Sequence, residues 1–173
     1  MKNVQIYPGA KIIGVENIEF GHDIIIDDFV FIYAKKKIRI ENYVHIAAFA
    51  SITGGEEVVL SDFSGISSGC RIFTATDDFS GSGFGNPTIP EEYRNTHRAP
   101  VMLGRFTIVG ANSVILPGVT LGEGVSVGAN SVVSRDLEPW GVYVGNRRIR
   151  ERDKKAVLEN YERFRLLHTF PEN

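Results

Sequence analysis

The sequence predicts an all-β solenoid, in which the chain winds into stacked coils of short parallel strands. Two observations lead to this fold class. An aliphatic residue returns at every sixth position over a long stretch, and a small residue recurs at a fixed offset from it. Strands alternate with period 2 and helices repeat with period 3.6, so a period of six indicates one short strand and one tight turn per repeat.

The repeat is most regular between residues 103 and 136. Its first positions are all aliphatic: Leu103, Val109, Ile115, Leu121, Val127 and Val133. Its fifth positions are small, and we expect them to point inward with the first: Thr107, Ser113, Val119, Val125 and Ser131. Three such units close one coil of about 18 residues. A β-sandwich is the alternative, but its turns recur at about 8–12 residues and do not hold a six-residue register.

The same register appears upstream with short slips, which we interpret as bulges at the corners of the coils. The first positions there are Phe20, Ile26 and Ile32, then Ile40, Ile46 and Ile52, then Leu60, Ile66 and Ile72. The register is lost between residues 74 and 101, a segment rich in Gly, Pro, Ser, Asp and Asn. In a solenoid, such an insertion forms a loop that projects from one face and often binds ligands.

The C-terminal region predicts a helix. From about Arg150, apolar residues fall at helical spacing: Val157, Leu158, Tyr161, Phe164 and Leu167. We expect this amphipathic helix to pack on the solenoid or to cap its open end, because an uncapped coil exposes strand edges. The predicted organisation is a β-helix domain, residues 1–149 with the inserted loop 74–101, followed by a C-terminal helix and tail, residues 150–173.

Composition limits the function classes. The 173-residue chain has a net charge of −2 and a pI near 6.1, which argues against a general nucleic-acid or membrane-surface binder. No stretch approaches ~20 continuous apolar residues, and the N-terminus lacks the apolar core of a signal peptide. The single cysteine, Cys70, falls at an inward fifth position, so we expect a small core residue in a protein of the reducing cytoplasm.

The stretch IVGANSVILPGVTLGEGVSVGANSVVSRDLEPWGVYVGNRR, residues 108–148, resembles the last coils of hexapeptide-repeat acyltransferases. That family includes galactoside, maltose, xenobiotic and nucleotide-sugar acetyltransferases. The resemblance implies a left-handed parallel β-helix, a homotrimer, and acetyl-CoA bound in a cleft between subunits. The segments HIAAFASITGG and NPTIPEEYRN are most similar to acetyltransferases of surface-polysaccharide biosynthesis. The implied reaction is transfer of an acetyl group to a hydroxyl or amine of a sugar or nucleotide-linked sugar.

Direct attack on a thioester needs a base for the acceptor's proton, and His45 is the favoured candidate. It is the sixth residue of its unit, so its side chain is predicted to point outward, aligned with Ile25 and Gly65. An exposed or interface histidine is the alternative. Many relatives carry a catalytic histidine just before the projecting loop, where this chain reads FTATDDFSG. Asp77 and Asp78 are therefore second candidates, although an Asx turn that opens the loop also explains them.

The loop supplies the candidate acceptor contacts. Sugars are recognised by planar polar groups and aromatic faces, and a nucleotide-linked sugar adds a diphosphate that Arg94 or Arg98 can meet. The alternative is that these side chains only order the loop. The candidates are Asn86, Glu91, Tyr93, Arg94 and His97.

For coenzyme A, the resemblance points to the late coils, whose small residues leave backbone groups within reach of the pantetheine arm. These candidates are Gly110, Ala111, Ser113, Gly128 and Ala129, with a backbone amide near Gly110 as a donor to the oxyanion. Three arginines after the last coil are candidates for the phosphates, or else form a solvated helix start: Arg147, Arg148 and Arg150.

Two other functions stay open. A non-catalytic scaffold or binding subunit would keep the solenoid and lose the base. A zinc enzyme like carbonic anhydrase would need three converging histidines. His22 and His45 fall on different coils and corners, and His97 falls in the loop, so we expect no metal. His168 is interpreted as a surface or packing residue of the helix.

Overall fold

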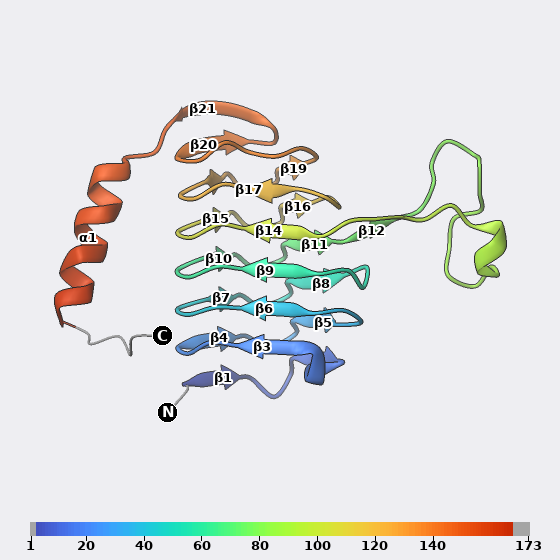
Figure 1. The fold of residues 1–173 in the computed structure, drawn as a ribbon, viewed down its shortest axis with the longest axis horizontal. Coiled ribbons are helices and arrows are strands. Elements are labelled where there is room, and N and C mark those ends of the chain that lie inside the picture. Colours follow the sequence, from blue (N-terminus) through green and yellow to red (C-terminus); the bar gives the residue numbers. More distant parts are fainter. Residues whose placement is uncertain (1–2, 168–173) are drawn as a thin grey trace.

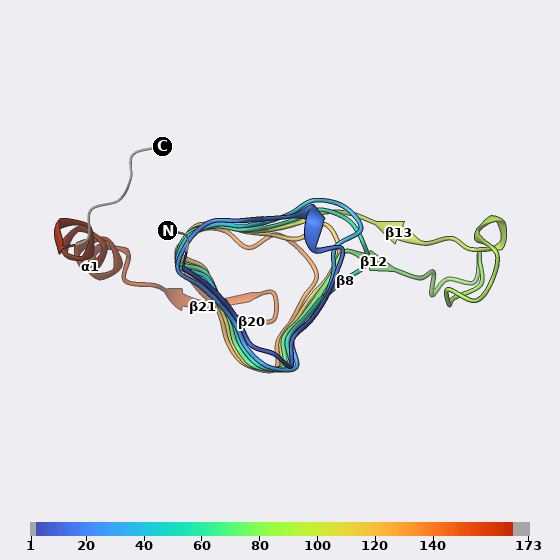
Figure 2. The same ribbon diagram turned by 90° about the horizontal axis from the view of Figure 1, so that it is seen from below.

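The computed structural model describes residues 3–167, which wind into a stack of coils with a triangular cross-section (Figures 1 and 2). Three sheets, here called faces A, B and C, form the sides of this prism. Each coil passes from face A to face B to face C, and each strand pairs in parallel with its counterparts in the neighbouring coils. The predicted β-solenoid is confirmed. His168 lies outside the described residues.

Each face is a ladder of strands two to five residues long. Face A contains β1 (Val4–Ile6), β4 (Ile24–Ile26), β7 (His45–Ile46), β10 (Gly65–Ile66), β15 (Ile108–Val109), β18 (Ser126–Val127), β20 (Gly141–Val144) and β21 (Arg147–Glu151). Face B contains β2 (Lys11–Ile13), β5 (Phe31–Tyr33), β8 (Ser51–Thr53), β11 (Arg71–Phe73), β16 (Val114–Ile115) and β19 (Val132–Val133). Face C contains β3 (Ile18–Phe20), β6 (Ile38–Ile40), β9 (Val58–Leu60), β14 (Val101–Leu103) and β17 (Thr120–Leu121). A short 3₁₀ turn, η1 (Val15–Asn17), precedes β3.

Aliphatic side chains fill the interior of the prism. The predicted first positions from Ile26 to Val133 are each no more than 3% exposed, and the small fifth positions are no more than 2% exposed. Phe20, in the first coil, is only partly buried. Cys70 is a core residue as predicted: its thiol donates to the Gly110 carbonyl at 3.1 Å, and burial raises its pKa. The inward register read from the sequence is therefore confirmed.

The slips in the register all fall at the edge between faces B and C, here called edge BC. Ile32 and Ile40 lie eight positions apart, as do Ile52 and Leu60, and both intervals cross that edge. The projecting loop interrupts the same crossing, between β11 and β14. Because strand pairing on either side keeps its register, the extra residues lengthen the corner without moving the inward side chains.

The loop is a stalk with a broader outer part. Its stem is an antiparallel pair, β12 (Ala75–Thr76) with β13 (His97–Arg98), and its outer part contains the 3₁₀ turn η2 (Glu91–Tyr93). The loop and the C-terminal helix project from opposite sides of the prism (Figure 2).

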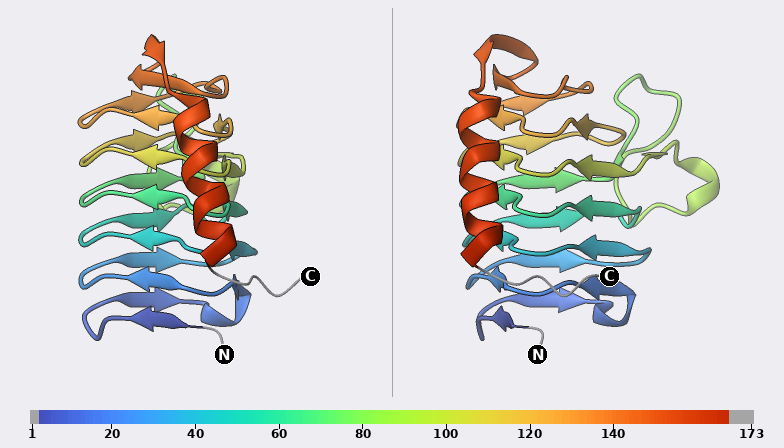
Figure 3. Two further views of the ribbon diagram at one scale, coloured as in Figure 1. Left: turned by 90° about the vertical axis from the view of Figure 1, so that its left-hand side faces the viewer. Right: turned by 60° about the vertical axis from the view of Figure 1, so that its left-hand side comes forward.

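Helix α1 (Lys154–Leu167) lies along the edge between faces C and A, here called edge CA, rather than over an open end (Figure 3). This edge carries a column of aromatic residues with positive φ: Tyr43, Phe63, Phe106 and Trp140. The ring of Phe164 packs 5.2 Å from that of Tyr43, and the ring of Tyr161 packs 5.4 Å from that of Phe106. The helix is thus held by edge-to-face aromatic contacts along several coils. No helix within residues 3–167 is long and apolar enough to cross a membrane.

The helix begins four residues later than predicted. Residues 147–151 form β21 instead, which pairs antiparallel with β20 and closes the last coil. The helix then starts where Asp153 can cap it, because its Oδ1 accepts the amide of Ala156 at 2.9 Å. The three arginines predicted near the cofactor phosphates therefore lie on a strand at the end of the prism rather than at a helix start.

Substitution of one inward residue tests this packing. Val127→Asp places a charge at a position that is 3% exposed, which costs several kcal/mol, so we expect the variant to be insoluble or unfolded by circular dichroism. Ser126→Asp, one residue earlier and pointing outward, is the matched control and should melt within a few degrees of the unaltered protein. A folded Val127→Asp protein would contradict the assigned register.

Candidate active site

His45 points outward from face A and contacts a carboxylate of the coil below. Its Nε2 lies 3.0 Å from Oδ2 of Asp27, and the two side chains are 52% and 30% exposed. An ionised carboxylate only accepts hydrogen bonds, so Nε2–H donates to it and Nδ1 carries the lone pair. Nδ1 has no hydrogen-bond partner within residues 3–167. This arrangement orients an imidazole to take a proton from an acceptor.

Open space lies directly above this pair. Ile25 and Gly65 flank His45 in face A, as the register predicts. A Cβ built at Gly65 would meet no atom within 4 Å. A reacting group can therefore approach His45 along face A without displacing another side chain.

The edge between faces A and B, here called edge AB, continues upward from His45 with small residues. The predicted cofactor contacts at this edge follow β15 and β18: Gly110, Ala111, Gly128 and Ala129. The Gly110 amide donates to Val127 O at 2.8 Å and the Gly128 amide to Tyr143 O at 2.8 Å, so both are used within the solenoid. The amides of Ala111 and Ala129 have no hydrogen-bond partner in the described chain, residues 3–167. The amides of Ala111 and Ala129 are therefore available as donors at this edge, whereas that of Gly110 is not.

Ser113 differs from the other predicted cofactor residues because it faces the interior. It is fully buried, and its hydroxyl donates to the Gly128 carbonyl at 3.0 Å and accepts the Ser131 amide at 3.2 Å. Its carbonyl accepts the amide of Arg71. Ser113 therefore joins two coils and offers no surface to a ligand.

The arginines of β21 lie at different distances from edge AB. Arg147 pairs with Val144 at the end of β20 that reaches this edge. Arg148 turns the other way: its Nη2 donates to Pro139 O at 3.2 Å and to Glu151 Oε2 at 2.6 Å. Both arginines are exposed, but the guanidinium of Arg148 is already paired. Arg147 is thus the better placed of the two to meet a phosphate above Ala129.

Asp77 lies at the base of the loop, on edge BC, and is paired with loop residues. Its Oδ1 accepts from Arg94 Nη2 at 3.2 Å and from Thr96 Oγ1 at 3.4 Å. These residues line a pocket of about 470 Å³, together with Lys35 and Arg98. The buried Nε of Arg94 has no partner in the described chain. The pocket therefore combines one carboxylate with three cationic side chains, a composition suited to an anionic ligand.

Asp78 is an anchor of the loop. Its carboxylate accepts the amide and hydroxyl of Ser80 and of Ser82, and the amide of Gly83. These hydrogen bonds, chiefly from the two serines, lower the pKa of Asp78 well below the usual value of a carboxyl. A carboxylate so stabilised is a poor general base, and the structure favours the Asx-type turn over the predicted catalytic role.

The outer loop residues stand away from His45. Asn86 bonds within the loop, its Oδ1 accepting the Thr88 amide at 3.0 Å, and Glu91 and Tyr93 belong to the exposed turn η2. His97 is exposed on the stem strand β13. Within one chain, the structure joins Arg94 to Asp77, but it does not bring these loop residues to His45.

The predicted residues therefore fall into two groups. His45 and the cofactor candidates at the small corners share edge AB, whereas Asp77 and the acceptor candidates share edge BC and its loop. Asp27, the partner of His45, was missed by sequence reasoning. The one available signal was the coil register, which places Asp27 two positions beyond the residue directly below His45.

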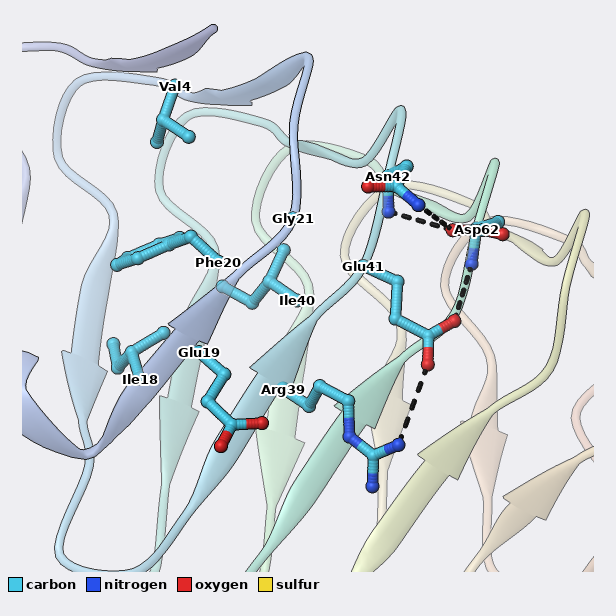
Figure 4. A pocket seen from close by; sticks show the side chains of 10 residues that line it. All are labelled: Val4, Ile18, Glu19, Phe20, Gly21, Arg39, Ile40, Glu41, Asn42 and Asp62. Carbon is cyan, nitrogen blue, oxygen red and sulfur yellow. Dashed lines mark hydrogen bonds and ion pairs between the residues drawn. The ribbon is translucent and has the colours of Figure 1, made fainter. Parts of the chain in front are cut away.

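A further pocket, of about 870 Å³, opens at the N-terminal end of face C (Figure 4). Val4, Ile18 and Phe20 line it where the interior of the first coil opens. Its acidic groups are paired: Glu41 Oε2 accepts the amide of Asp62 at 3.2 Å. No predicted site residue lines this pocket.

The three histidines considered for zinc lie on different parts of the prism. His22 lies at edge CA, where its Nδ1 is 2.7 Å from Asp23 Oδ2, whereas His45 is on face A and His97 on the loop stem. Across residues 3–167 there is no group of three or more His, Cys, Asp or Glu side chains placed to hold a metal ion.

Comparisons with known proteins bear directly on this geometry. The family model described as bacterial transferase hexapeptide (six repeats) matches residues 100–135. A dTDP-4-amino-4,6-dideoxy-D-glucose acyltransferase of Escherichia coli is 41% identical over 159 residues, which cover 90% of this chain and 83% of that protein. The chain belongs to the hexapeptide-repeat acyltransferases. The predictions of family and of acyl transfer are confirmed.

Two further comparisons place this acyltransferase more closely. AntD, an N-acyltransferase from Bacillus cereus solved with dTDP and 3-hydroxybutyryl-CoA, is 40% identical with a TM-score of 0.90, over 96% of this chain and 89% of AntD. WbbJ of Escherichia coli K12, named for O-acetyl transfer in lipopolysaccharide biosynthesis, is 32% identical over 75% of this chain and 65% of its own length. The likeness to AntD confirms the predicted left-handed β-helix.

The arginines of β21 give a test of the cofactor groove. Arg147→Ala should weaken coenzyme A binding about fivefold to tenfold, because one exposed charge-assisted contact with a phosphate is lost, and calorimetric titration with coenzyme A measures this. Arg148→Ala, whose guanidinium is held by Pro139 and Glu151, is the matched control and should change the affinity less. A larger loss of coenzyme A affinity in Arg148→Ala than in Arg147→Ala would place the phosphates nearer edge CA.

Proposed function

We propose that this acyltransferase moves an acyl group from coenzyme A to the amino group of a dTDP-linked 4-amino-4,6-dideoxy sugar. The observation that carries the proposal is the likeness to AntD as solved with dTDP-4-amino-4,6-dideoxyglucose and coenzyme A, at 40% identity over 95% of this chain. That span includes the projecting loop and both edges described above. The Escherichia coli relative at 41% identity is named for the same amino sugar.

An O-acetyl transfer is the second candidate, supported by the similarity to WbbJ over 75% of this chain. The two candidates differ in what they require of the base. A hydroxyl must be deprotonated as it attacks, whereas a neutral amine attacks first and loses its proton afterwards. The higher identity and the greater coverage of the amino-sugar relatives favour N-acylation.

The chemistry assigned to edge AB follows from its groups. The amine attacks the thioester carbonyl, the C–N bond forms, and the proton released from nitrogen passes to Nδ1 of His45. Asp27 holds the opposite side of the ring and stabilises the imidazolium. The amide of Ala111 lies two coils above His45, so it is placed to bind the pantetheine arm rather than the oxyanion. Collapse of the tetrahedral intermediate breaks the C–S bond, and the thiolate takes the proton back from His45 to leave as free coenzyme A.

We assign the acyl donor only as a coenzyme A thioester. AntD has been solved with 3-hydroxybutyryl-CoA, and WbbJ is named for acetyl transfer. The open space at Gly65 is compatible with an acyl chain longer than acetyl. The original expectation of acetyl-CoA therefore remains one arm of the test.

Asp77 is the alternative base. The solved forms of AntD include substitutions of one serine and of one aspartate ten positions further along. Three pairs in this chain have that separation: Ser67 with Asp77, Ser68 with Asp78, and Ser126 with Asp136, whose Oδ1 already accepts the Thr120 amide. Ser67 and Ser68 lie on edge AB, in the coil between His45 and Ala111. This spacing makes Asp77 the first residue to test if His45 is dispensable.

We propose further that the working form is a homotrimer. Edge AB and the loop on edge BC lie apart within one chain, and the loop extends well beyond the prism (Figure 1). A neighbouring subunit would bring the loop base, with Lys35, Arg94 and Arg98, toward edge AB, where these cations can meet the diphosphate of the acceptor. The lone buried thiol of Cys70 favours a reducing cytoplasm as the compartment.

Coupled thiol release tests the reaction. The protein is offered acetyl-CoA or 3-hydroxybutyryl-CoA together with dTDP-4-amino-4,6-dideoxyglucose, dTDP-glucose or a free galactoside. We expect release only with the amino sugar. Thiol release with the hydroxyl acceptors alone would establish O-acyl transfer, the second candidate. No thiol release with any acceptor, together with no binding of coenzyme A, would favour a non-catalytic scaffold or binding subunit.

Variants of the His45 pair test the base. His45→Ala should lower kcat by about 10²–10⁴, because a general base contributes that factor, while the affinity for coenzyme A stays unchanged. Asp27→Asn should give a smaller loss, since the ring remains but its orientation and charge partner are weakened. His22→Ala is the matched control: it removes the other His–Asp pair, at edge CA, and should leave kcat unchanged. Full turnover in His45→Ala, with loss in Asp77→Asn, would move the base to the loop.

A further inference from the structure

Two phenylalanines, Phe29 and Phe49, form an exposed aromatic step on edge AB. They occupy the same corner position in adjacent coils, and their rings stack with centroids 5.0 Å apart and planes 9° from parallel. They are 62% and 58% exposed. The step thus leaves two large apolar rings in water beside the His45–Asp27 pair.

The backbone also favours smaller residues at this corner. Phe29 and Phe49 have φ values of 62° and 63°, in the left-handed region where most side chains are strained. In the next three coils, residue types that tolerate this conformation take the position: Gly69, Asn112 and Asn130. The rings are therefore retained against both the local backbone preference and their own exposure.

Edge CA provides an internal comparison. Aromatic residues with positive φ form a column there too, but the side chains of Tyr161 and Phe164 pack on it, and Phe106 is only 6% exposed. In the described chain, residues 3–167, nothing buries the step at edge AB to that extent. The column at edge CA has a structural role, whereas the step at edge AB has a free ring face.

Gly69 occupies the position above Phe49 in the next coil. Adjacent coils are about 4.8 Å apart, so a ring stacked on Phe49 lies at the level of Gly69, which has no side chain. Asn112 reaches down from the next coil, and its Oδ1 fills the place where a side chain of residue 69 would begin. The amide of Asn112 can therefore hydrogen-bond the edge of a planar ligand that stacks on Phe49.

Hydrogen bonds from Arg71 hold the backbone of the platform in place. Arg71 Nη1 donates to Phe49 O and to Gly69 O, at 2.6 Å each, and so joins the two corners. A rigid platform loses little entropy when a ligand stacks on it.

We propose that Phe49, backed by Phe29, binds the pyrimidine base of the nucleotide-linked acceptor. The inference rests on the proposed function, which gives the acceptor a thymine at one end and the reacting amine at the other. A flat, exposed ring face with an amide at its edge suits a planar ring that carries hydrogen-bonding groups, as a pyrimidine does. The base lies on the Gly69 side of the corner, and the acyl chain reaches His45 from the Gly65 side.

Phe49→Asn tests the platform, because asparagine suits the left-handed backbone but cannot stack. We expect dTDP to bind roughly 10–100-fold more weakly by calorimetry, the loss typical of one base–aromatic stack, with unchanged affinity for coenzyme A and for inorganic pyrophosphate. The KM for the amino-sugar nucleotide should rise by a similar factor, and Phe49→Trp should restore binding. Phe79→Asn, at a 93% exposed phenylalanine of the loop, is the matched control and should bind dTDP normally.

Fold and assembly are checked on the same samples. The melting temperature of Phe49→Asn should stay within about 2 °C of the unaltered protein, since relief of backbone strain offsets the lost ring stacking, and its mass by light scattering should not change. Equal dTDP affinity in the two proteins, or dissociation of the oligomer in Phe49→Asn, would overturn the inference; the second result would make the step a subunit contact. An unaltered protein that binds coenzyme A but no dTDP would instead contradict the proposed function itself.

Discussion

In-register stacking of buried aliphatic side chains is the constraint on which the whole structure depends. Each coil repeats the inward residues of the coil below, so every face presents a column of aliphatic side chains to the interior. On face A this column includes Ile26, Ile46, Ile66, Val109 and Val127. Burial of one such side chain contributes about 1.5–3 kcal/mol, and a shift of one residue would expose the entire column. The register is consequently fixed, and it also fixes what points outward.

The outward residues therefore form straight columns, and chemistry accumulates along edges rather than within one continuous segment. Edge AB combines a proton acceptor, two amides that have no partner within residues 3–167, an exposed arginine and an aromatic step, all from coils that are far apart in sequence. Edge BC is the place where extra residues are tolerated, and it carries the loop and its cationic pocket. Edge CA is covered by α1 and has a structural role. A substrate that spans two of these edges requires a second subunit, which is the physical reason for proposing a trimer.

The fold was predictable because the period of six is present in the letters themselves. The same register places His45 between Ile25 and Gly65, as the structure confirms. It could not identify Asp27, because that contact depends on how a long side chain reaches diagonally across one coil. Nor could spacing distinguish Arg147 from Arg148, since the direction of each guanidinium is set by the antiparallel return of β21. Ser113 was assigned to the cofactor by family likeness, although its own inward position excluded it. The loop gave the least information, because its conformation depends on local hydrogen bonds such as those of Asp78, which have no periodic signature.

The central claim is that one edge of the prism holds both the acyl donor and the proton acceptor. A crystal structure of the protein with coenzyme A and dTDP tests it most directly. We predict a pantetheine arm that runs down edge AB past the amides of Ala129 and Ala111, with its sulfur beside His45. Coenzyme A bound along edge CA, or with its sulfur at the Asp77 pocket and more than one coil from His45 of every subunit, would contradict the account.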